Sequence, residues 1–198
     1  MLSKLSRQVA LLVLAAAALT GCATSYVLDN NVQSFSSLGA LPAQPTYRFD
    51  RLPSQQAFQF QTQVEAMADP ALFKAGLRRD DAIPQLGVQV TARVQRALSP
   101  WADPWDGWGG MHGWGRWHGS FGAGGPFPRM EQPWYHREVG VIVRELPTNR
   151  VVYETHAVND GPWSDNASVF PAMFDAAMQG FPNAPAGARQ VNVKVGSN

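Results

Sequence analysis

The sequence has few features that would indicate a nucleic-acid-binding or multispanning membrane protein. Its 198 residues contain 16 basic and 15 acidic side chains, and the formal net charge is +1. There is no basic run, RNA-binding motif or DNA-binding pattern, so nucleic acid is not an expected partner. After residue 21, no apolar run reaches the roughly 20 residues that a membrane-spanning helix needs.

Catalytic and cofactor signatures are also missing. Gly119-Ser120-Phe121-Gly122 is not a nucleophile elbow, which has the form Gly-x-Ser-x-Gly at a strand-to-helix turn. No dinucleotide fingerprint and no phosphate-binding loop occurs. We therefore expect no enzyme activity, no cofactor and no catalytic residues.

The first 21 residues have the features of an export signal. Lys4 and Arg7 precede an apolar stretch of 11 residues, 9–19, which is too short to span roughly 30 Å of hydrocarbon. Leu19-Thr20-Gly21-Cys22 follows and resembles the lipobox of bacterial lipoproteins. This resemblance implies that Cys22 receives a diacylglycerol thioether and, after N-acylation, becomes the first residue of the mature chain. The alternative is an ordinary secretory signal that leaves Cys22, the only cysteine, as a free thiol in an oxidising compartment.

The residue after the cysteine bears on the compartment. Ala23 stands where an aspartate would, by the same resemblance, favour retention in the inner membrane. We therefore expect an anchor in the outer membrane, with the protein on its periplasmic face. Residues 22–45 are expected to hold the lipidated cysteine, a polar tether and a possible first strand, and the tether would reach roughly 70 Å when fully extended.

Residues 46–198 have the periodicities of a single α+β domain. Strict alternation over 88–95 predicts a half-buried strand, and two β-branched runs around Pro147-Thr148-Asn149 predict a hairpin. The expected strands lie near 32–38 and over 46–52, 88–95, 137–146, 150–158 and 191–195. They predict a mixed or antiparallel sheet of about five to six strands with two helices packed on one face.

Two helical regions are expected beside these strands. The first runs from Ser54 to about Arg79 and is interrupted at Asp69-Pro70, where aspartate would cap a second piece. The second runs from about Ser168 to Gln179, because Pro171 is tolerated best in a first turn. Its expected buried stripe is Phe170, Met173, Phe174, Ala177, Met178 and Phe181.

This order of elements behind a lipobox resembles the bacterial lipoprotein family called domain of unknown function 4136. Tyr47-Arg48-Phe49 resembles the family's aromatic strand before its first helix. Ala75-Gly76-Leu77 and Leu86–Val90 resemble the end of that helix and the strand that follows.

The strongest likeness lies in Val139–Val158, where Thr148–Tyr153 resembles the family's Thr-Gly-Lys-x-Val-Trp turn and strand. The likeness covers about residues 26–183. It departs from the family at a long aromatic insert and at Tyr153, where tryptophan is usual. It implies an α+β fold and brings no established catalytic residues.

Residues 99–134 form this insert, which is rich in tryptophan and glycine. Glycine at this density prevents a regular helix or strand, so a long loop between two strands is expected. Six of the seven tryptophans fall here. The candidate binding residues are Trp101, Trp105, Trp108, Trp114, Arg116, Trp117 and Trp134.

Four interpretations of the insert are open. Its rings pack on the domain surface, or they enter the lipid leaflet, since tryptophan prefers the water–lipid boundary. Alternatively, flat rings and Arg116 bind a glycan or a partner protein. The fourth interpretation is a metal site, although the spacing matches no standard motif; its ligands would be His112 and His118 with Asp103, Asp106 or His136.

Together these features predict a non-enzymatic lipoprotein of the cell envelope with a binding, scaffolding or envelope-maintenance role. Its expected partners are the membrane, through lipidated Cys22, and an envelope protein or a glycan. The alternative is an enzyme or a metal-binding accessory protein that acts through the insert.

Overall fold

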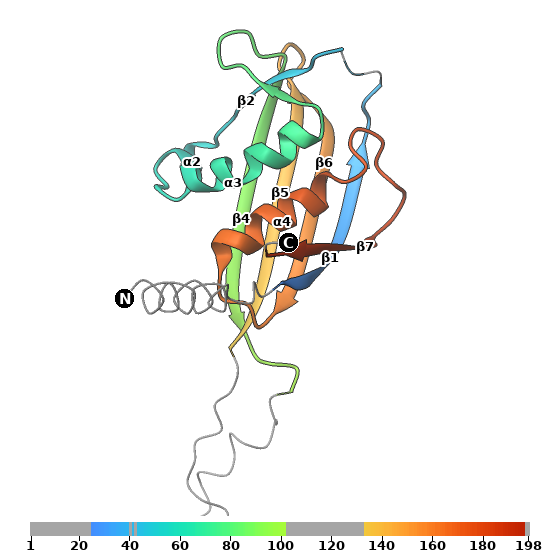
Figure 1. Cartoon of the computed structure of the whole chain (residues 1–198). Helices are drawn as coiled ribbons and strands as arrows, with labels where there is room; N and C mark the ends of the chain where they lie inside the picture. Colours follow the sequence, from blue (N-terminus) through green and yellow to red (C-terminus); the bar gives the residue numbers. More distant parts are fainter. Residues whose placement is uncertain (1–24, 40, 42, 102–132, 197–198) are drawn as a thin grey trace, which may run out of the picture.

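The strands carry alternating apolar residues and pair into one mixed sheet, and the helices cover one of its faces (Figure 1). The computed structural model describes residues 25–39, 41, 43–101 and 133–196. The strands are β1 (Tyr26–Ser36), β2 (Thr46–Phe49), β3 (Arg78–Arg79), β4 (Leu86–Ala97), β5 (Trp134–Glu145), β6 (Arg150–Gly161) and β7 (Arg189–Val195). The helices are α2 (Pro53–Gln56), α3 (Gln61–Lys74) and α4 (Asn166–Met178).

The sheet confirms the predicted α+β class. Within the described residues it has seven strands in the order β3-β2-β4-β5-β6-β1-β7, rather than the five or six expected. β2 pairs in parallel with β3 and β4, and the other neighbours are antiparallel. The additional strand is β3, whose two arginines were expected to end the first helical region.

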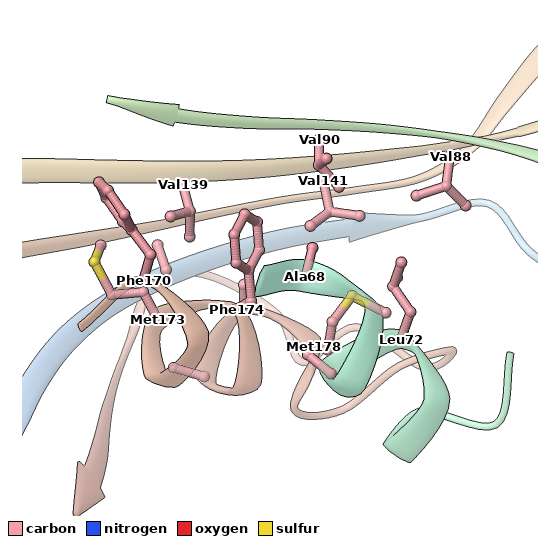
Figure 2. Packing of buried hydrophobic residues seen from close by; sticks show 14 of the residues in the cluster. Ala68, Leu72, Val88, Val90, Val139, Val141, Phe170, Met173, Phe174 and Met178 are labelled. Atoms are coloured by element: carbon pink, nitrogen blue, oxygen red, sulfur yellow. The ribbon is translucent and has the colours of Figure 1, made fainter. Parts of the chain in front are cut away.

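The hydrophobic core lies between the sheet and the two longer helices, α3 and α4. Val88 and Val90 of β4 pair with Val143 and Val141 of β5, and all four side chains are buried. Phe174 of α4 is fully buried, and its ring points toward the sheet near Val139 and Val141 of β5, as Figure 2 shows. Burying each side chain of this size stabilises the fold by about 1.5–3 kcal/mol relative to exposure.

β1 begins earlier than the sequence indicated, at Tyr26 rather than near Val32, and pairs with β6 and β7 on its two sides. The residues of β1 alternate between buried and exposed, but the sequence does not show this because two of the buried residues, Asn30 and Ser34, are polar. Asn30 donates through Nδ2 to the Val191 carbonyl at 3.2 Å, and the Ser34 and Thr155 hydroxyls lie 2.8 Å apart. The connection from Cys22 to the sheet is therefore much shorter than the expected tether, because only residues 23–25 lie between them.

α3 runs through Pro70 without the predicted break and ends at Lys74 rather than near Arg79. Gly76 ends it with a φ of 94°, which favours glycine. The Gly76 and Leu77 amides donate to the Phe73 and Leu72 carbonyls, both at 3.0 Å, in a Schellman motif. Leu72 and Leu77 are both buried at this turn, so packing holds the helix end.

α4 begins at Asn166, two residues before the predicted start. The Asp165 carboxylate accepts from the Ala167 amide at 3.0 Å and caps the first turn. Pro171 therefore lies in the second turn, where its missing N–H costs one helical hydrogen bond. Burial of the predicted residues Phe170, Met173, Phe174, Ala177 and Met178 offsets that loss.

Candidate functional site

The strand register brings one end of β1, β4, β5 and β6 together. A row of directly paired residues crosses the four strands: Arg93, Glu138, Val158 and Asn31. Tyr26 and Leu98 each lie five residues from this row in the same direction, because β1 runs antiparallel to β4. This end, at the bottom of Figure 1, is called the aromatic end below. Its aromatic residues are Tyr26, Trp101, Trp134, Tyr135 and Trp163.

A stacked pair of rings joins the start of β1 to the segment after β6. The Tyr26 and Trp163 ring centroids are 4.0 Å apart, with 20° between the ring planes. Burial, and secondarily the Asp165 carboxylate, raises the pKa of Tyr26 above the ordinary tyrosine value. The phenol therefore stays neutral, and the pair is an uncharged, flat surface.

Arg137 of β5 is fully buried beneath this end. Its Nε donates to Asn166 Oδ1 at 2.8 Å, and its Nη2 donates to the Trp163 carbonyl. The guanidinium carbon lies 4.9 Å from the centre of the Tyr135 ring. Burial lowers the pKa of Arg137, but an arginine remains charged at neutral pH. One buried cation thus fixes the segment between β6 and α4 to the central strand.

Two apolar side chains at the aromatic end, outside the segment that Arg137 fixes, are exposed to solvent. Trp101 is 87% exposed and Leu98 is 82% exposed, both just after β4. Trp134 is half-buried and pairs with Ala97 as the first residue of β5, so it belongs to a strand and not to the predicted loop. The arrangement leaves aromatic and aliphatic groups exposed on a fixed support.

The sheet face opposite the helices carries charged pairs instead. His136 Nδ1 lies 2.8 Å from Asp160, and His156 Nε2 lies 2.8 Å from Glu154. The His156 ring also approaches Glu138 at 3.6 Å. In the described part of the chain, no three histidine, cysteine, aspartate or glutamate side chains are grouped so as to hold a metal ion.

A shallow groove of about 530 Å³ lies at the C-terminal ends of α3 and α4, beside β7. Lys74 and Asp175 form an ion pair across it at 2.6 Å. Met178 and Phe181 supply apolar walls. The groove contains none of the predicted site residues.

The structure describes two of the seven predicted binding residues, Trp101 and Trp134, and places both at the aromatic end. The other predicted site residues lie outside the described part of the chain: Leu19, Thr20, Gly21, Cys22, Trp105, Trp108, Trp114, Arg116 and Trp117. Sequence reasoning missed Tyr26, Arg137 and Trp163. Tyr26 falls in the segment expected to hold the tether, and Trp163 lies outside every predicted element, so only the tertiary structure reveals that the two rings meet.

Asp165 at the edge of this site should make α4 stability depend on pH. The Ser168 hydroxyl, and to a lesser degree the Ala167 amide, lowers the pKa of this carboxyl by donating to it. A pKa lowered by folding means that the stabilisation is present above the unfolded value of about 3.9 and is lost as the pH falls through the folded value. Asp165→Ala should lower the free energy of unfolding by about 1 kcal/mol at neutral pH, as measured by urea denaturation.

The matched control is Asp165→Asn, which keeps the capping oxygen without the titrating group. It should be nearly as stable as the wild-type protein at neutral pH, and its stability should lack the acid-dependent component. Equal losses for alanine and asparagine would contradict the capping role.

No helix in the described ranges is both long enough and apolar enough to cross a membrane. The profile described as "Domain of unknown function (DUF4136)" matches residues 31–183 of the chain. The comparison of the chain with curated proteins found no match.

Among solved structures, the chain is similar to a PDZ domain protein from Parabacteroides distasonis ATCC 8503 at 15% identity and a TM-score of 0.51. The match covers 91% of this chain and 41% of that protein, so this chain spans about two-fifths of its length. The PelC dodecamer from Paraburkholderia phytofirmans matches at 10% identity over 75% of this chain and 94% of that chain, with TM-scores of 0.46 and, for a variant, 0.43. At these identities the first likeness shows a shared fold alone.

Proposed function

The chain belongs to the family of domain of unknown function 4136, as its motifs predicted, and on this basis we propose that it is a non-enzymatic, lipid-anchored lipoprotein of the cell envelope. Cys22 carries the anchor, in the outer membrane with the domain on the periplasmic face. Its role is to bind or scaffold an envelope partner. The observation that carries the proposal is the lipobox-like Leu19–Cys22 directly ahead of the first strand.

The short distance between Cys22 and β1 supports an anchor that also positions the domain. Four Cα steps lead from Cys22 to Tyr26, and a fully extended chain covers at most about 14 Å in four steps. Two or more acyl chains on Cys22 would give a stable attachment, whereas one would be marginal. A domain held so closely remains at the membrane surface, where envelope proteins and glycans are within reach.

The aromatic end supports binding rather than catalysis. Exposed Trp101 and the Tyr26–Trp163 pair offer flat ring surfaces on a rigid base. Rings of this kind contribute to binding by stacking and by burying apolar area. The two described histidines, His136 and His156, lie on the sheet face opposite the helices, and each pairs there with a carboxylate.

Replacing the proposed anchor tests this function. Cys22→Ala should move the protein from the membrane fraction to the soluble fraction after cell lysis, because the thioether can no longer form. Ser25→Ala, a matched change three residues further along the chain at an exposed position, should leave the distribution unchanged. Mass spectrometry of the wild-type N-terminus should find acylated Cys22.

A Cys22→Ala protein that stays in the membrane fraction, or a wild-type protein with a free thiol, would refute the anchor. Crosslinking of the lipidated protein to its neighbours in intact cells, followed by pull-down, then tests the binding role. A single stoichiometric envelope protein or glycan is the expected product, and its absence would count against scaffolding.

A further inference from the structure

Tryptophan is concentrated at one end of the described structure. The described tryptophans are Trp101, Trp134 and Trp163, and all three lie at the aromatic end. Val94 of β4 and Leu98, which directly follows β4, are also exposed. Tryptophan and tyrosine favour the boundary between lipid and water, because the ring is apolar while the N–H or O–H stays hydrated.

The connection to Cys22 brings this same end close to lipid. Tyr26 begins β1 at the aromatic end, at most about 14 Å of extended chain from Cys22. The interfacial layer on each side of a bilayer is several Å thick, and a domain on so short a connection lies within reach of it. We propose that the aromatic end is a membrane-contacting surface that rests in the headgroup layer of the leaflet holding Cys22, with Leu98 and Trp101 inserted.

This inference depends on the lipid anchor proposed above, and it adds an orientation to it. The strands stand away from the leaflet, and the end where β4 begins points into the periplasm. β4 has 12 residues, so its two ends are separated by about 36 Å. Ile83, three residues before β4, therefore lies far from the headgroups although it is 77% exposed.

Charge does not explain the contact. Arg93 and Arg96 are exposed near the aromatic end, but Asp160 and Asp165 lie there too. Mixed charges of this kind give little net attraction to anionic lipid. The contact should therefore form on zwitterionic phosphatidylcholine and resist added salt.

The chain offers a clean labelling strategy, because Cys22 is its only cysteine. Once that thiol is a thioether, an introduced cysteine is the only reactive one. Leu98→Cys and Ile83→Cys form a matched pair, since both positions are exposed by more than three-quarters and lie at opposite ends of β4. Each lipidated variant is labelled with an environment-sensitive NBD fluorophore and reconstituted into phosphatidylcholine vesicles.

The expected result is a blue shift of NBD emission at position 98 on reconstitution and quenching by lipids that carry a spin label near the headgroup. Position 83 should show neither change. The same shift at position 98 should persist in high salt. A Trp101→Ser change in the Leu98→Cys background should reduce the blue shift, while Phe58→Ser, an exposed ring elsewhere, should not.

The outcomes separate the two proposals. Vesicles that float with the protein while both positions stay in water overturn the membrane-contacting surface and leave the anchor intact. Quenching at both positions, or only at position 83, overturns it as well. Protein that fails to float, or that labels at Cys22, refutes the anchor and the inference together. Circular dichroism melts confirm that each variant is folded.

Discussion

Replacing Phe174 with alanine is expected to lower the free energy of unfolding by about 3–5 kcal/mol, the range for truncating a buried phenylalanine. The ring is fully buried on α4 and points toward the sheet, near Val139 and Val141 of β5 (Figure 2). Alanine removes apolar area from the core and leaves a cavity that the helix and the paired strands close only in part. Urea denaturation of the wild-type and variant domains measures the difference.

The size of this change is large for a domain of this length. Single domains are stable by about 5–15 kcal/mol, so the variant would lose a substantial share of its stability. Phe58→Ala is the matched control, because this ring is 59% exposed, and its loss should stay within about 0.5 kcal/mol. Similar losses for the two variants would show that α4 is not the main cover of the sheet.

Arg137→Ala is expected to cost about 2–4 kcal/mol, because it removes the hydrogen bonds to two part-buried acceptors and opens a cavity where the buried guanidinium was. The acceptors are Asn166 Oδ1 and the Trp163 carbonyl, which hold the segment between β6 and α4. The desolvation of the guanidinium opposes this stabilisation in the native protein. Thermal or urea denaturation gives the net value, and Arg93→Ala on neighbouring β4 serves as the exposed control.

Arg137→Met separates packing from hydrogen bonding. Methionine fills much of the volume but donates to neither acceptor, so its stability should lie between those of the wild-type and alanine proteins. The Tyr26–Trp163 stack should loosen in both variants, and the near-ultraviolet circular dichroism of these rings should weaken. A methionine variant as stable as the wild type would mean that desolvation cancels the two hydrogen bonds.

Local patterns in the sequence predicted the elements whose neighbours are close in the chain. β4 alternates valine and alanine with polar residues, and β5 and β6 flank a short turn where Asn149 adopts a φ of 53°. In such a hairpin the turn sets the register, so the prediction needs no distant contact. The buried stripe of α4 was also predictable, because its helical repeat is strong.

The errors occur where distant contacts outweigh local signals. Pro70 indicated a helix boundary, yet Ala68, Ala71 and Leu72 are buried on either side of it and hold α3 together. β1 looked polar because Asn30 and Ser34 face the core, where their hydrogen bonds come from β7 and β6. Neither partner strand can be identified from β1 itself, since each lies more than 100 residues away in the chain.

By itself, the sequence determined the family, the α+β class and a candidate lipid anchor at Cys22, because each depends on a short motif or on a local repeat. Only the tertiary structure decided where Tyr26, Arg137 and Trp163 meet. Their juxtaposition follows from the antiparallel register of β1, β4, β5 and β6, which sums many backbone hydrogen bonds between distant segments. That register brings aromatic residues that are distant in the sequence to one end of the sheet, and this end is close along the chain to the residue proposed to hold the lipid.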